Sequence, residues 1–291
     1  MTATEHGQKS YYIPDPSPWP ITAMLSILLM LAGAALWMNA VSFGVWMVIA
    51  GFGLLAFMFY GWFGDVIREG MTDKYNAQVD RSFRQGMFWF IASEVFFFAT
   101  FFGALYYVRE IALPWLGGEG YLGATREILY SKFTADWPSS GPGQVGGEFL
   151  PMGAWGVPAM NTFILLSSGA TVTWAHWGLK MDNQKHLVWG LAATVGLGFL
   201  FVVLQAWEYQ HAYKELNLTL ESGIYGSTFY LLTGFHGFHV TLGAVMLLAV
   251  LGRAMKSHFS PHNHFAFEAV AWYRHFVDVV WLGLFIFVYW L

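Results

Sequence analysis

The stretch QGMFWFIASEVFFFATFFGALYY (residues 85–107) decides how the rest of this chain is interpreted. It is long enough to cross a bilayer as a helix, and its one formal charge, Glu94, lies near its middle. At about 1.5 Å of rise per residue, Glu94 lies roughly 13 Å from one end of the stretch and about 20 Å from the other. A carboxylate at that depth costs about 2.5–3.5 kcal/mol on insertion scales. Glu94 is therefore neutral, or paired inside the protein, or kept for a function.

The composition is that of a polytopic membrane protein. Hydrophobic residues make up 56% of the chain and charged residues 11%, with a mean hydropathy of +0.47, whereas soluble domains carry about 25% charged residues. The net charge of -4 gives no indication of a nucleic-acid partner. The chain has no cysteine, which excludes disulfides, thiolate metal sites, iron–sulfur clusters and c-type haem attachment on this chain.

Seven apolar segments are long enough to span a bilayer: 21–38, 43–64, 83–108, 159–178, 187–207, 228–251 and 271–291. We therefore predict an all-α fold with seven transmembrane helices. A polar, proline-rich arm (1–20) precedes a first pair of spans (21–64), and a charged connector (65–82) leads to five further spans (83–291). Glycine and proline forbid a spanning helix in the long loop 111–157. The four residues 39–42 predict a tight turn between the first two spans.

Lysine and arginine residues indicate the orientation, because they are enriched on the cytoplasmic side. With the N-terminus inside, ten lie on the inner side and four on the outer side. The inner set is Lys9, Arg68, Lys74, Arg81, Arg84, Lys180, Lys185, Arg253, Lys256 and Arg274; the outer set is Arg109, Arg126, Lys132 and Lys214. This distribution predicts a cytoplasmic N-terminus, and a C-terminus and long loop on the outer side.

The predicted spans contain few polar groups. His236 and His239 are three residues apart and share a helix face, as do His275 and Asp278, which can pair locally, whereas Arg274 is expected to point elsewhere. These residues and Glu208 are candidates for structural polar clusters. A metal or haem site on the histidines would need further converging ligands. Hydroxyl groups and an amide in the fourth span are expected to join neighbouring helices: Asn161, Thr162, Ser167, Ser168, Thr171 and Thr173.

Three classes of function remain open from these residues. A secondary transporter that uses the midplane carboxylate of Glu94 should show broken helices in two related halves, and the seven spans show neither. A redox enzyme should show its ligands. A cofactor-free subunit of a larger membrane assembly fits best. Within it, Glu94 is either a neutral structural carboxyl or a group that carries a proton.

Five motifs together resemble subunit III of the haem–copper cytochrome c oxidases, in a bacterial form. They are GWFGDVIREG (61–70), FIASEVFFFATFFGALYY (90–107), NTFILLSSGATVTWAH (161–176), SGIYGSTFYLLTGFHGFHV (222–240) and HFAFEAVAWYRHFVDVVW (264–281). The resemblance covers nearly the whole chain. It implies a seven-helix subunit that binds no haem or copper, in which the first two helices lean away from the other five and phospholipids fill the cleft.

The resemblance also implies partners and a role. Such a subunit packs chiefly on the catalytic subunit I, next to subunit II, in a complex that oxidises cytochrome c, reduces oxygen and moves protons outward. It supports proton uptake by subunit I and protects that subunit from inactivation. For this chain, the implied location is a bacterial inner membrane.

The resemblance assigns roles to individual residues. Glu94 matches the buried carboxylate of the family's SEV motif, and the lipid head-group candidates are Trp62, Glu69, Arg253, Lys256 and His258. No residue is assigned to catalysis or to a metal. The chain departs from the family pattern at three positions. Arg274 replaces a usual Trp and is expected to reach the inner surface, Trp177 replaces a frequent His, and Tyr75 replaces a His that some members place near lipid.

Overall fold

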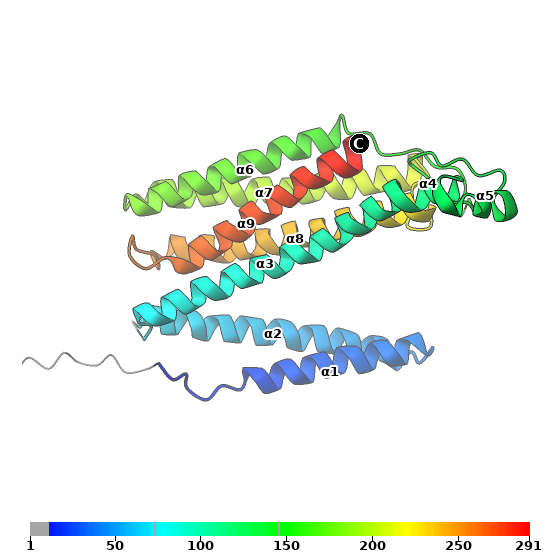
Figure 1. Ribbon diagram of the computed structural model, residues 1–291. Helices are drawn as coiled ribbons and strands as arrows, with labels where there is room; N and C mark the ends of the chain where they lie inside the picture. The colour runs from blue at the N-terminus through cyan, green and yellow to red at the C-terminus, as the bar shows by residue number, and fades with distance from the viewer. Residues whose placement is uncertain (1–11, 73, 145) are drawn as a thin grey trace, which may run out of the picture. The chain divides into compact units, whose positions relative to one another are not determined.

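The computed structural model describes residues 12–72, 74–144 and 146–291 (Figure 1). Residues 1–11 of the expected N-terminal arm, and Lys9 of the inner charge set, lie outside the described residues. The chain forms two compact units, residues 1–83 and 84–291, and the division falls within helix α3 (Ala77–Tyr107). Every regular element in the described residues is helical, which confirms the predicted all-α class.

The first unit is built on a hairpin of α1 (Trp19–Met38) and α2 (Phe43–Met71). The turn between them uses Ala40 with a φ of 62°. Glycines let the two helices approach closely, because a Cβ atom on Gly44 would lie 2.5 Å from the carbonyl oxygen of Gly33. Many other side chains of both helices are exposed and apolar, as in helices whose outer surfaces face lipid or another protein.

The connector between the first helices and α3 is short. Helix α2 continues to Met71 and α3 begins at Ala77, so most of the segment 65–82 is helical. The side chain of Asn76 accepts hydrogen bonds from the backbone N–H groups of Gln78 (3.0 Å) and Val79 (3.0 Å). These bonds satisfy backbone donors that the first turn of a helix leaves without partners.

The second unit contains the rest of α3 and four further long helices. These are α6 (Val157–Lys180), α7 (Gln184–Glu215), α8 (Gly223–Met255) and α9 (Phe265–Leu284). Figure 1 shows them side by side, and contacts join α6 to α7, α7 to α8, α8 to α9, and α6 to α9. Short elements fill the long loop and the C-terminal end: η1 (Val108–Ala112), α4 (Leu113–Leu116), η2 (Gly120–Leu122), α5 (Ala124–Leu129) and η3 (Phe285–Trp290).

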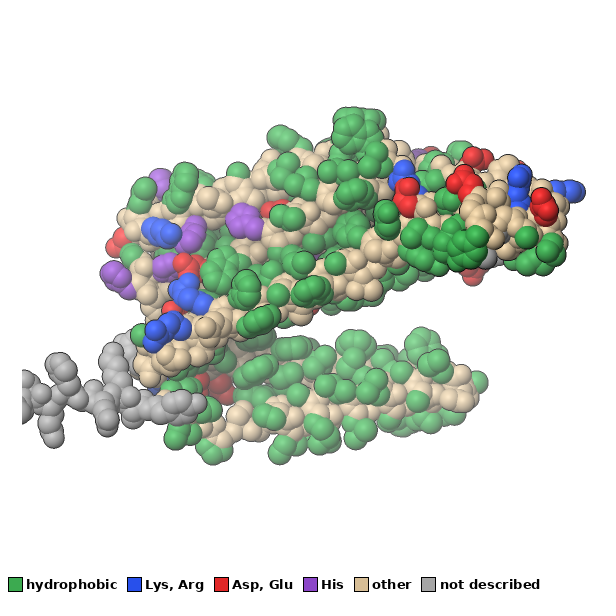
Figure 2. Space-filling model, in the orientation of Figure 1, with side chains coloured by type: hydrophobic (Ala, Val, Ile, Leu, Met, Phe, Trp, Pro, Cys, Tyr) green, Lys and Arg blue, Asp and Glu red, His purple; other side chains and the backbone are tan. Residues whose placement is uncertain are grey.

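The core of the second unit consists of two clusters of buried apolar side chains. The larger one joins α3, α7, α8 and α9 through rings such as Phe98, Phe201 and Trp281, which are at most 2% exposed. The smaller one joins the ends of α6 and α8 to the start of α7 and α9 around Leu179, Leu187 and Phe267. Figure 2 shows apolar side chains along this unit and most of the visible charged groups toward its two ends. This distribution suits a protein that crosses a membrane.

Six helices in the described residues are long and apolar enough to cross a membrane. They begin at Trp19, Phe43, Ala77, Gln184, Gly223 and Phe265. The chain therefore has the character of a multi-pass membrane protein. Helix α6, which contains the predicted fourth span, is 24 residues long but is not among the six. Serine, threonine, asparagine and histidine residues lower the hydropathy of α6. That α6 crosses the membrane therefore stays a prediction.

Candidate functional site

Glu94 of α3 is paired inside the second unit. Its Oε2 atom lies 2.9 Å from Nε2 of His239 on α8. The side chain of Glu94 is 22% exposed and that of His239 is 9% exposed. The rings of Phe97 and Phe98 lie against His239, with centroid distances of 5.9 Å and 5.0 Å. The structure thus places the buried carboxylate beside one polar partner among aromatic rings.

The hydrogen bonds of His239 determine how many protons this pair holds. Its Nδ1 atom lies 2.6 Å from the carbonyl oxygen of Phe235, an acceptor, so Nδ1 carries a hydrogen and donates it. A hydrogen bond between Nε2 and Glu94 then needs one further proton, held by either partner. A neutral imidazole with a protonated carboxyl and an imidazolium with a carboxylate both carry zero net charge. The pair therefore avoids the cost of an isolated charge at this depth.

A second polar cluster lies in the middle of α9. Asp278 Oδ1 is 3.4 Å from Arg274 Nη2, and Oδ2 is 3.9 Å from His275 Nδ1. The expectation that Arg274 points away from Asp278 and reaches the inner surface is wrong. Residues four apart share a helix face, and Arg274 is 2% exposed because it is covered by the bundle. Gly169 on α6 makes room for the cluster, since a Cβ atom there would lie 3.0 Å from Asp278 Oδ2.

The other predicted cluster members have separate partners. Tyr289 donates a hydrogen bond to Glu208 Oε1 at 2.6 Å, and both residues are buried. His236 is buried with Nε2 3.1 Å from the carbonyl oxygen of Val277, and its ring packs on Trp281. His236 and the histidine three residues later on the same helix therefore have different partners and do not converge on a ligand site.

Some polar side chains of the fourth span join helices in the second unit, as expected, whereas the buried amide of Asn161 has no hydrogen-bond partner among the described residues and Thr173 donates within α6. Ser168 on α6 donates to the carbonyl oxygen of Thr194 on α7 at 3.3 Å, and the hydroxyls of Thr171 and Thr194 are 2.8 Å apart. On the α9 side, the indole of Trp281 donates to Thr162 at 2.8 Å. Polar contacts therefore hold α6 in place on two sides.

A polar cavity lies within the first unit, at the start of α1 and the end of α2. Its volume is about 370 Å³, and its lining combines aromatic, acidic and basic side chains that include Trp19, Trp62, Asp65, Arg68, Glu69 and Lys74. Glu69 Oε2 accepts hydrogen bonds from the hydroxyls of Tyr75 (2.8 Å) and Tyr12 (3.0 Å). The pKa of Tyr75 is raised above its usual range, mainly by burial and to a smaller extent by the hydrogen bond to Glu69.

The basic lipid candidates lie at the end of α8. Arg253 is partly buried, with its guanidinium 4.5 Å from the centre of the Phe259 ring. Lys256 is exposed, and His258 is partly buried. The guanidinium thus lies against an aromatic face while Lys256 is open to the surroundings, an arrangement suited to an anionic group at a membrane surface.

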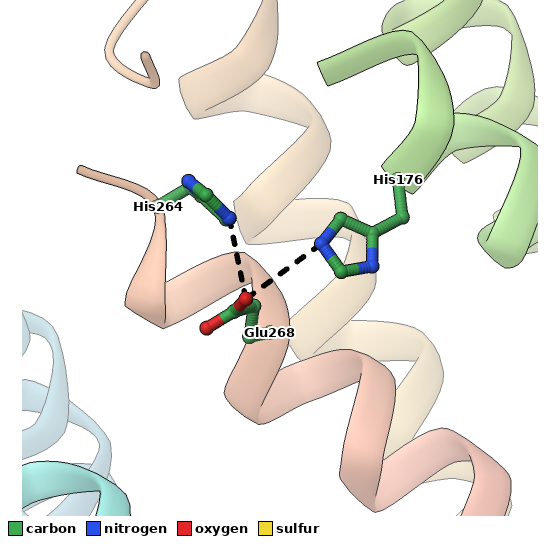
Figure 3. Close-up of side chains that lie close together, drawn as sticks. All are labelled: His176, His264 and Glu268. Atoms are coloured by element: carbon green, nitrogen blue, oxygen red, sulfur yellow. Dashed lines mark ion pairs between the residues drawn. The ribbon is translucent and has the colours of Figure 1, made fainter. Parts of the chain in front are cut away.

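The structure also shows a cluster that the sequence analysis missed (Figure 3). His264 and Glu268 at the start of α9 lie beside His176 near the end of α6. Glu268 Oε1 is 3.2 Å from Nε2 of His264 and 3.7 Å from Nε2 of His176. The other oxygen of Glu268 forms an ion pair with Arg84 of α3. The four-residue spacing of His264 and Glu268 was a visible signal, but nothing in the sequence pointed to His176.

Comparison with known proteins gives a match over nearly the whole chain. The sequence model of the family described as "Cytochrome c oxidase subunit III" matches residues 9–118 and 132–291. Proteins named cytochrome c oxidase subunit 3 from Canis lupus, Carassius auratus and Squalus acanthias are each 41% identical over 286 residues. Each alignment covers 98% of this chain and 98% of the relative.

Proposed function

This chain belongs to the cytochrome c oxidase subunit III family, and we propose that it is a non-catalytic core subunit of such an oxidase. In this role it packs chiefly against subunit I, beside subunit II, while the complex passes electrons from cytochrome c to oxygen and translocates protons. It supports proton uptake and the stability of subunit I. The observation that carries this proposal is the 41% identity over 98% of the chain with proteins that bear the subunit's name.

In the proposed topology, α6 crosses the membrane as the fourth span and brings the total to seven, and the N-terminus is cytoplasmic. With 24 residues, α6 is about 36 Å long at 1.5 Å per residue, which exceeds the hydrocarbon core of about 30 Å. The contacts of its polar residues with α7 and α9 support this assignment, because they lower the cost of burying those residues in a membrane. Arg274 lies inside the bundle and no longer counts toward the orientation. Nine inner lysine and arginine residues against four outer ones still favour a cytoplasmic N-terminus.

We place the chain in a bacterial inner membrane. This placement follows from the resemblance of the long outer loop to a bacterial form. Residues 119–131 of that loop fall between the two segments that match the family sequence model. This part of the loop therefore differs from the family's common pattern.

Glu94 and His239 serve within the subunit as a net-neutral pair that can hold or pass one proton.

Phospholipid binding is the second part of the proposed role. The polar cavity of the first unit supports it, because Trp62 and Glu69 line the cavity beside Arg68 and Lys74, and its volume of about 370 Å³ is within the range of small-molecule sites. Arg253 and Lys256 offer positive charge to an anionic head group. Replacing both by Ala should lower the phospholipid that co-purifies, as measured by mass spectrometry. Unchanged lipid content would refute the head-group assignment.

Purification of the tagged chain from its native membrane tests the main proposal. The co-purified material should show the optical spectrum of haem and should oxidise reduced cytochrome c with consumption of oxygen. A chain that is isolated intact but without a haem-containing partner would refute the oxidase role. That outcome would favour a transporter that uses the carboxylate of Glu94.

A further inference from the structure

We propose that His176, His264 and Glu268 form a Zn²⁺ site at the end of the second unit, where α6 ends and α9 begins. Their ligand atoms, one from each residue, all lie within 4.8 Å of one another. Two imidazole nitrogens and one carboxylate oxygen are a ligand set that Zn²⁺ uses, with a water molecule in the fourth position. The site would be an addition to the subunit's proposed role.

Two of the three ligand separations suit a tetrahedral ion, and the third, between the two histidine nitrogens, is at most 4.8 Å. Zn²⁺ binds nitrogen and oxygen ligands at about 2.0–2.2 Å, so two tetrahedral ligands lie about 3.3–3.6 Å apart. Glu268 Oε1 lies 3.2 Å from His264 Nε2 and 3.7 Å from His176 Nε2. Both contacts thus lie close to the separation that a shared ion requires. Figure 3 shows both imidazole rings turned toward the same carboxylate oxygen.

The tautomer of His264 is the one that metal binding needs. Its Nδ1 atom lies 3.0 Å from the carbonyl oxygen of Ser260, so Nδ1 donates a hydrogen and leaves Nε2 with a free lone pair. The side chain of His264 is 10% exposed. Its buried Nε2 atom has no hydrogen-bond partner among the described residues, and neither does the buried Nε2 of His176. Two buried nitrogens thus face one carboxylate oxygen without a conventional hydrogen bond, and a bound ion would satisfy all three atoms.

The opposite side of Glu268 supports the same assignment. Its second oxygen pairs with Arg84, whose guanidinium also lies 5.3 Å from the centre of the Phe265 ring. This contact orients the carboxylate with Oε1 directed toward the histidines, as supporting hydrogen bonds commonly do for metal ligands. The positive charge of Arg84 also repels a bound cation and so weakens the binding of Zn²⁺. The site should therefore bind Zn²⁺ reversibly and be emptied by a chelator.

The ion would connect two helices. His176 belongs to α6, and the other two ligands lie at the N-terminal end of α9, where the chain enters the helix from the loop. A shared ion ties these elements together and restrains the start of α9. Zn²⁺ should therefore raise the temperature at which the chain unfolds, because it binds only the folded arrangement of the three ligands.

The test counts Zn²⁺ on the intact complex that contains this chain. The complex is stripped with EDTA, dialysed against a series of Zn²⁺ concentrations, and analysed for zinc per copy of the chain. The variants are His176→Gln, His264→Gln and the double variant. The matched control is His262→Gln, which changes an exposed histidine of the same loop. Haem content per chain verifies that each variant complex has assembled.

We expect each single variant to lose the same one equivalent of zinc, because each removes one ligand of the same ion. The loss of affinity should be at least about 10–100-fold, since disturbing only the groups that support a ligand already costs that much. The double variant should lose one equivalent and not two, because both histidines hold one ion. The control should match the wild type, and only complexes with an intact site should gain thermal stability from Zn²⁺.

Two results would overturn the assignment. Equal zinc content in wild type and His264→Gln would show that the cluster binds no ion, and the loss of two equivalents in the double variant would show two separate sites. If His176→Gln fails to accumulate, the comparison of His264→Gln with His262→Gln decides the question alone. Zinc is counted per copy of this chain, and the counts are compared between variant and control whether or not haem co-purifies. The proposed function can therefore fail while the site stands, and the reverse.

Discussion

The pair of Glu94 and His239 predicts that side-chain shape and hydrogen bonding matter more at this position than charge. Because His239 donates through Nδ1 to Phe235 and contacts Glu94 through Nε2 at 2.9 Å, the pair has zero net charge in either protonation arrangement. Glu94→Gln keeps the volume and supplies an amide N–H to a neutral Nε2 atom. Glu94→Leu keeps similar bulk but leaves that nitrogen without a partner.

The structure sets the magnitude of each change. Glu94→Gln should alter the free energy of unfolding by less than about 1 kcal/mol, because one hydrogen bond replaces another. Glu94→Leu should cost about 1–3 kcal/mol, because the buried His239 nitrogen remains unsatisfied. Adding His239→Leu removes the orphaned group, so the double variant should cost less than the sum of the single variants. The coupling should be about 0.6–1.7 kcal/mol, as for hydrogen bonds between membrane helices.

The assay is a double-mutant cycle in which SDS unfolds the purified chain and tryptophan fluorescence reports the folded fraction. Thr100→Val is the matched control on the same helix, because the Thr100 hydroxyl donates only to the backbone of Phe96 at 2.9 Å. The control should stay within about 0.5 kcal/mol of wild type. Zero coupling between Glu94 and His239 would refute their contact. A cost for Glu94→Gln as large as that of Glu94→Leu would refute the conclusion that charge is dispensable.

Two further predictions concern packing and buried charge. Gly44→Ala should destabilise the first hairpin by about 1–3 kcal/mol, because the new Cβ would lie 2.5 Å from the Gly33 carbonyl oxygen, whereas Gly53→Ala, with no atom within 4 Å, should be neutral. Thermal unfolding compares the two, and equal melting temperatures would contradict the close approach. Asp278→Leu should cost about 3–5 kcal/mol because it strands the buried Arg274. The double variant Asp278→Leu with Arg274→Met should restore most of the amount of folded chain found in membranes. A double variant that accumulates no better than Asp278→Leu would argue against the ion pair of Arg274 and Asp278.

The sequence could indicate that Glu94 must be neutral, paired or functional, but it could not indicate which residue is its partner. A single charge in a long apolar run is visible in the sequence, because its cost depends only on depth. His239 lies 145 residues away on another helix, and no local spacing connects the two. Which helices become neighbours is decided by packing across the bundle, and a one-dimensional pattern does not contain that information.

The spacing of residues along α9 allowed two partners for Asp278, and the structure uses both. His275 and Arg274 stand three and four residues from Asp278, and both spacings place a side chain on the same face. From the sequence, His275 was expected to pair with Asp278 and Arg274 to point elsewhere. The structure places both beside the carboxylate, at 3.9 Å and 3.4 Å. The burial of Arg274 was missed for a related reason. A basic side chain near a predicted helix start was expected to reach water, but α9 begins nine residues before Arg274.

The polar side of α6 bears on how the chain is inserted during synthesis. The hydroxyl of Ser168 reaches the backbone of Thr194 on α7, and Thr171 also contacts Thr194, so part of the polar surface of α6 is satisfied only after α7 has been made. A segment of this kind enters hydrocarbon poorly when it leaves the insertion machinery alone. If α6 crosses the membrane as proposed, α6 and α7 should enter as a pair, and a nascent chain cut after Lys180 should leave α6 in the aqueous phase.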